Sequence, residues 1–165
     1  MKTSQHGYSV LELLIYIALF AFLSVVLIQS LVTVMKTYTQ AQSYRALQTN
    51  GEFVMERITR ELRNGTTATT SACATTPGTL SIASTDSGGT SHTNVFMVAD
   101  AKAQLVTDGA GAVDLSTTEV SVTSLTFCSL TTPVGQGVKT TLVLSTTKGI
   151  PISASFYSTI VLRGQ

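Results

Sequence analysis

The stretch HGYSVLELLIYIALFAFLSVVLIQS covers residues 6–30 and is almost wholly apolar. No charged residue follows Glu12 until Lys36, so Leu13–Met35 is an uncharged run of 23 residues. It contains no Gly or Pro, which predicts one uninterrupted helix. Such a helix is about 35 Å long, enough to cross a hydrocarbon core of about 30 Å. The carboxylate of Glu12 needs an explanation, because a charge in a bilayer costs at least a few kcal/mol.

The rest of the 165-residue chain differs from this segment in its charge pattern. Net charge is +1, which argues against the strongly basic surface typical of nucleic-acid binding. Charged residues are dense from Lys36 to Arg63 and absent from Asn64 to Thr85. The sequence therefore predicts an apolar rod, a charged helical continuation and a polar, weakly charged C-terminal domain.

Two ordinary explanations of the apolar segment fit it incompletely. A secretory signal has an apolar core of about 7–15 residues and a small-x-small cleavage site, and this run is longer and lacks an Ala-x-Ala motif. A plain transmembrane anchor explains the length but leaves Glu12 without a purpose. Lys2 precedes the segment and weakly favours a cytoplasmic N-terminus, with the C-terminal domain outside the cytoplasm.

The motif GYSVLE, Gly7–Glu12, resembles the processing site of type IV pilins and pseudopilins. In that family a peptidase cuts after a glycine that ends a short basic leader. The new N-terminal residue is N-methylated, and a glutamate stands fifth from the cut. The resemblance implies a leader Met1–Gly7, a methylated N-terminus at Tyr8, and Glu12 as the fifth residue. Tyr8 departs from the usual Phe but keeps the aromatic ring.

The resemblance also gives Glu12 a purpose. Cleavage leaves a positive α-amino group at Tyr8, and Glu12 of an adjacent subunit offers it a counter-charge, because a buried pair is better tolerated than either ion alone. The same helix then holds the subunit in the membrane and later packs in a filament core. The implied partners are other pilin or pseudopilin subunits, the prepilin peptidase and an inner-membrane assembly platform.

The helix is expected to continue through ALQTNGEFVMERITRELRNG, Ala46–Gly65. Glycine at 51 could permit a bend, and Asn64-Gly65 is a stop signal. The charges indicate a solvated face, with a subunit contact as the alternative. This segment resembles J-type minor pseudopilins of type II secretion and W-type minor pilins. Its apolar residues recur on one helical face and predict packing on a sheet: Leu47, Val54, Ile58 and Leu62.

The remainder predicts antiparallel strands. Thr66–Thr93 is rich in Ser and Thr and favours an exposed loop region with one short strand at Thr79–Ala83 over a glycosylated or flexible connection. Within Glu119–Leu130 the apolar residues change parity, which predicts a bulge or bend near residues 123–124. The other expected strands or apolar alternations are Asn94–Ala99, Lys102–Thr107, Val138–Thr146 and Ile152–Leu162, and Asp108–Asp114 is expected to be a turn.

Few residues are candidates for a disulfide, a catalytic site or a metal site. Cys73 and Cys128 belong to no CxxC pair and predict one disulfide outside the cytoplasm, with two unpaired thiols as the alternative. His92 has no nucleophile or acid placed beside it by the sequence, so it is read as an exposed loop residue. Aspartates 100, 108 and 114 match no calcium motif. We therefore expect no metal, no cofactor and no enzyme activity.

Together these observations predict an α+β, pilin-like fold, in which a long N-terminal helix packs through its second half on an antiparallel β-sheet domain. The expected divisions are a leader 1–7, a transmembrane or filament-core helix 8–35, an amphipathic continuation 36–64 and an exported β-rich domain 65–165. The predicted function is a minor pilin or pseudopilin. The alternative is an extracytoplasmic binding protein or enzyme on a non-cleaved anchor.

Overall fold

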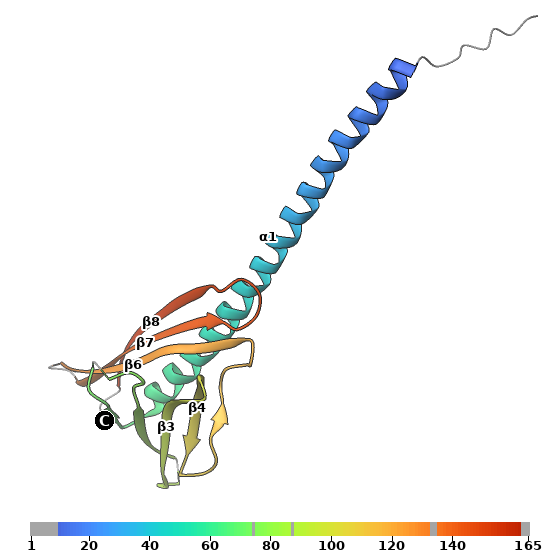
Figure 1. Cartoon of the computed structure of the whole chain (residues 1–165). Helices are drawn as coiled ribbons and strands as arrows, with labels where there is room; N and C mark the ends of the chain where they lie inside the picture. Colours follow the sequence, from blue (N-terminus) through green and yellow to red (C-terminus); the bar gives the residue numbers. More distant parts are fainter. Residues whose placement is uncertain (1–9, 74, 87, 133–134, 163–165) are drawn as a thin grey trace, which may run out of the picture. The chain divides into compact units, whose positions relative to one another are not determined.

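The computed structural model describes residues 10–73, 75–86, 88–132 and 135–162. It has an α+β fold, in which the helix α1 (Val10–Asn64) is followed by antiparallel strands (Figure 1). The chain divides into two compact units between Gln40 and Ala41. The second unit contains the last part of α1 together with all the described strands, so the core of the β-rich part is assembled within it.

The C-terminal part of α1 packs as its apolar pattern predicts. Leu47, Val54, Ile58 and Leu62 are each at most 1% exposed and belong to one hydrophobic core. The helix ends at Asn64, directly after Arg63 in its last turn. Burial of these side chains holds the helix against the strands and is the main contribution of this segment to stability, since each large apolar side chain contributes about 1.5–3 kcal/mol.

The first sheet is a five-stranded antiparallel meander in the order β1-β2-β3-β4-β5. The turn between β3 and β4 consists of Asp100 and Ala101, both with positive φ (51° and 56°). A two-residue turn of this hand matches the twist of the strands it joins. The strands are β1 (Thr67–Thr70), β2 (Leu80–Thr85), β3 (Ser91–Ala99), β4 (Lys102–Thr107) and β5 (Val113–Asp114).

The second sheet has the order β6-β7-β8, formed by β6 (Val120–Thr132), β7 (Gly135–Thr146) and β8 (Ser153–Val161). The register of β6 against β7 shifts between Val122 and Ser124. This confirms the predicted irregularity, and it explains how Val122 and Leu125 can both be buried although their sequence spacing is odd.

The β-rich part differs from expectation in having two sheets where the sequence indicated one. The Ser/Thr-rich region contributes β1 as well as β2. Strand β1 has the sequence TATT and buries only Ala68, so it carries no alternation of large apolar residues that would mark it as a strand. Similarly, the expected turn at Asp108–Asp114 ends in the short strand β5.

Candidate functional site

The N-terminal part of α1 exposes an extended apolar surface. Its large hydrophobic residues from Val10 to Met35 are all at least 45% exposed, and the helix is long and apolar enough to cross a membrane. A water-soluble monomer rarely exposes a contiguous apolar surface of this extent. This surface is therefore a candidate for contact with lipid or with other protein chains.

Glu12 is the one residue of Val10–Met35 with a charged form at neutral pH. It lies in the first turn of α1, where a carboxylate is favourable to the helix dipole. The hydroxyl of Tyr16 donates a hydrogen bond of 3.1 Å to Glu12 Oε1. Glu12 is also half-buried, whereas every other residue of Val10–Leu23 is exposed.

Serine and threonine hydroxyl groups elsewhere on α1 donate hydrogen bonds to backbone carbonyls of the same helix, unlike the Tyr16 hydroxyl. Ser24 donates to the carbonyl of Phe20 at 2.8 Å, and Thr33 to that of Gln29 at 2.9 Å. Such back-bonding removes the cost of an unpaired hydroxyl in an apolar environment. An ionised carboxylate cannot donate to a carbonyl, so Glu12 can be satisfied only by hydrogen-bond donors.

The other residues of the predicted processing site, Gly7 and Tyr8, lie outside the described residues. Of the three predicted site residues, the structure therefore describes only Glu12. Among the residues that the structure describes, the hydrogen bond that Glu12 accepts is at Oε1, and the residues around it on α1 are exposed.

The predicted disulfide is confirmed: Cys73 and Cys128 are bonded, with their Cα atoms 4.5 Å apart. The bond ties the segment after β1 to β6. A second link lies nearby, because the side-chain amide of Gln136 on β7 donates to the carbonyl of Ala68 on β1 at 2.6 Å. Its Oε1 accepts from the backbone N–H of Ala68 at 3.4 Å. These links join an edge strand of the first sheet to the second sheet.

Some charged residues in the C-terminal part of α1 make contacts that hold the fold together. Arg57 pairs with Glu61 at 3.0 Å, and Glu61 also accepts from Asn94 on β3 at 2.9 Å. The Glu61 side chain is only 13% exposed. The reading of this face as simply solvated is therefore incomplete, because Glu61 connects α1 to the first sheet. Glu56 and Arg60, which also stand four residues apart on α1, form no ion pair among the residues that the structure describes.

His92 is not the isolated loop residue that the sequence predicts. It lies in β3, half-buried, with Nδ1 2.6 Å from Asp108 Oδ2 and Nε2 3.6 Å from Asp86 Oδ2. The hydrogen bond to Asp108 is the main reason that the pKa of His92 is raised, and Asp86 acts in the same direction. The two carboxyl pKa values are lowered. For Asp86 the main cause is backbone hydrogen bonds from Thr90 and Gly88, and for Asp108 it is His92.

The aspartates considered for calcium are separated in this arrangement. Asp108 is bonded to His92, while Asp114 pairs with Lys102 and accepts from Gln104 at 2.8 Å. Within the described ranges, no three His, Cys, Asp or Glu side chains gather where they could hold a metal ion. The Lys102 and Gln104 contacts lower the pKa of Asp114, with Lys102 the larger cause.

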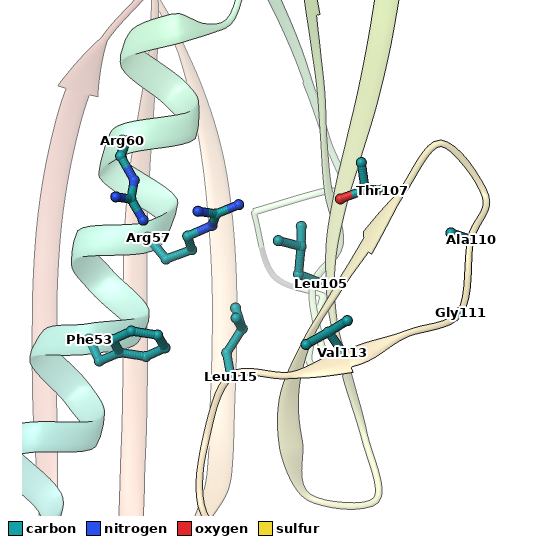
Figure 2. Close-up of a pocket in the computed structure, with 9 residues that line it drawn as sticks. All are labelled: Phe53, Arg57, Arg60, Leu105, Thr107, Ala110, Gly111, Val113 and Leu115. Carbon is teal, nitrogen blue, oxygen red and sulfur yellow. The ribbon is translucent and has the colours of Figure 1, made fainter.

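A shallow pocket of ≈ 340 Å³ opens between α1 and the β4–β5 region (Figure 2). Phe53, Arg57 and Arg60 line it from successive turns of the helix, and Leu105, Val113 and Leu115 line it from the sheet side. Among its described lining residues there is no carboxylate, histidine or cysteine, so they provide no acid–base pair or thiol nucleophile. The pocket's lining is mostly apolar, with the guanidinium groups of Arg57 and Arg60 on the helix side and the hydroxyl of Thr107 on the sheet side.

Neither a protein-family model, nor a curated protein, nor a solved structure matches this chain. The functional candidates on the molecule itself are the exposed apolar part of α1 with Glu12 and Tyr16, and the pocket beside Arg57 and Arg60. Sequence reasoning identified Glu12 because a charge in an apolar run is conspicuous. It missed the Tyr16 contact, although the spacing of four residues was a usable signal.

Proposed function

We propose that this protein is a structural subunit, a minor pilin or pseudopilin, of a type IV pilus or type II secretion pseudopilus. The observation that carries the proposal is Glu12, a single carboxylate at the start of an exposed apolar helix. A membrane anchor alone gains nothing from a carboxylate there, since a charged side chain weakens insertion. A subunit that must dock beside a neighbouring N-terminus gains a specific counter-charge.

The proposed mechanism is assembly. The prepilin peptidase cuts after Gly7 and frees the amine of Tyr8, which is then methylated. The apolar part of α1 holds the subunit in the cytoplasmic membrane, N-terminus inside and the β-rich part outside. An inner-membrane platform moves the subunit into the filament, where its apolar surface packs against other subunits and Glu12 pairs with a neighbour's N-terminal ammonium group.

The pairing sets the register between neighbouring helices. Apolar packing alone is non-directional, so helices with a uniform apolar surface can slide along one another at little cost. One buried ion pair penalises every register that separates its charges, because an unpaired buried charge costs several kcal/mol. Glu12 thus supplies the specificity that the surrounding Leu, Ile and Val side chains lack.

Replacement of Glu12 tests this mechanism. In cells that assemble the filament, Glu12→Gln is expected to leave the protein in the membrane and to reduce its incorporation at least tenfold, because removing one partner of a buried pair costs about 3–5 kcal/mol. Gln29→Ala is the matched control, since it removes a polar group from the same apolar segment without changing charge. Incorporation is measured as the fraction of the protein recovered in sheared filaments, or by cross-linking to neighbouring subunits for a pseudopilus.

A pilin-like subunit and a permanent membrane anchor predict different effects of replacing Glu12. For a permanent anchor of an enzyme or binding protein, Glu12→Ala is neutral or improves insertion. If Glu12→Gln enters filaments as well as the wild-type protein does, the counter-charge mechanism is wrong.

A further inference from the structure

The Tyr16 phenol is placed over Glu12 by the geometry of the helix. Helical side chains lean toward the N-terminus, so a residue at position i+4 reaches back to the residue at position i. Tyr16 Oη accordingly lies 3.1 Å from Glu12 Oε1. Glu12 is half-buried, whereas its neighbours in Val10–Leu23 are exposed.

This contact answers a chemical need of the carboxylate. An ionised carboxylate accepts hydrogen bonds at both oxygens and is stabilised in an apolar setting only when donors reach it. Among the described side chains of Val10–Met35, Tyr16 is the donor to Glu12. Tyrosine suits the position because its ring is compatible with an apolar environment while its hydroxyl donates.

We propose that Tyr16 is a positioning residue for assembly: its phenol holds Oε1 of Glu12 and leaves Oε2 for the N-terminal ammonium group of a neighbouring subunit. This inference rests on the proposed function. The hydrogen bond fixes the carboxylate in one orientation before docking, so less side-chain freedom is lost when the ion pair forms. The hydrogen bond also makes the register between neighbouring helices depend on how Tyr16 orients the Glu12 carboxylate.

The test uses the full chain and the variant Tyr16→Phe, which keeps the ring and removes only the hydroxyl. Tyr44→Phe is the matched control, because Tyr44 is an exposed tyrosine of the same helix outside the apolar run. Infrared spectra are recorded in lipid bilayers on protein with ¹³C-labelled glutamate carboxyl groups, and the Glu12 band is assigned by its loss in Glu12→Gln. Incorporation of each variant is measured in filament-assembling cells.

We expect Tyr16→Phe to shift the Glu12 band to higher frequency and to reduce incorporation about tenfold, the equivalent of one hydrogen bond to a charged group. Tyr44→Phe should change neither. A Glu12 band that does not move, or one that moves with normal incorporation, overturns the positioning role while Glu12→Gln still reports on the proposed function. If Glu12→Gln itself assembles normally, the proposed function's ion pair fails and the role of Tyr16 in it fails too.

Discussion

At the scale of single residues, Gly51 shows why a glycine stands inside a helix. The sequence alone suggested a possible bend. In the structure, a Cβ at this position would overlap the ring of Phe156, which β8 places against α1. The absence of a side chain therefore allows the strand and the helix to approach closely, and this outweighs the helix-propensity cost of glycine of about 1 kcal/mol.

Gly51→Ala is expected to lower the free energy of unfolding by about 1–2 kcal/mol. The added methyl group forces the Phe156 ring to move, at the usual overpacking cost of about 1–3 kcal/mol, and the gain in helix propensity offsets part of it. Urea unfolding of the full chain in detergent measures the change. In a Phe156→Ala background the same substitution should be neutral or stabilising, and equal destabilisation in both backgrounds would refute the contact as the cause.

His92 gives a pH dependence at the same scale. Its pKa is raised in the folded protein by Asp108 and Asp86, so its contribution is fully present below the unfolded value of about 6.5 and is lost as pH rises through the folded pKa. The pKa values of Asp86 and Asp108 are lowered, so their contributions are present above about 3.8 and are lost on further acidification.

This cluster, which links β3 to the residues after β2 and β4, is therefore expected to stabilise the first sheet most between about pH 4 and 6.5. Thermal unfolding of the wild type and of His92→Gln, compared from pH 4 to 9 at low salt, checks the sign. The wild type should lose stability relative to the variant as pH rises above about 6.5. The difference should shrink in high salt, because the side chains of His92, Asp86 and Asp108 are 40%, 47% and 44% exposed. A difference that is constant over this range would show that the histidine charge does not contribute.

At the scale of elements, local pattern and non-local pairing were predictable to different degrees. The helical stripe and the bulge in β6 follow from spacing along one segment, so the sequence predicted them. Strand β1 depends on pairing with β2 and on the distant side chain of Gln136, so its four residues carry no signal of their own. The His92 cluster likewise needs β3 and β4 to pair before residues 16 apart can meet.

The disulfide Cys73–Cys128 is expected to stabilise the protein where the segment after β1 meets β6. It closes a separation of 55 residues, for which loop-closure entropy predicts about 2–4 kcal/mol. Replacing both Cys73 and Cys128 with Ser should lower the free energy of unfolding by that amount, measured by urea unfolding under oxidising conditions. Wild-type protein with reductant should match the variant, and the variant should not respond to reductant. Equal midpoints for variant and oxidised wild type would show that the bond contributes no net stability.

At the scale of the whole molecule, the chain combines a folded β-rich part with its own core and a helix segment whose apolar residues are exposed. Charge and hydropathy also change sharply along the sequence, from the uncharged run Leu13–Met35 to the dense charges of Lys36–Arg63. The sequence singled out Glu12 within the apolar run, but the pocket beside Arg57 depends on side chains from α1 and the β4–β5 region and could not be seen in one segment.

We propose that the chain is processed as a pilin-like subunit. Intact mass and N-terminal sequencing of the protein from its native membrane test it most directly. If the chain is such a subunit, the protein begins at N-methylated Tyr8 and lacks Met1–Gly7. A chain that retains Met1–Gly7 in cells with active prepilin peptidase would contradict it and would make α1 a permanent anchor.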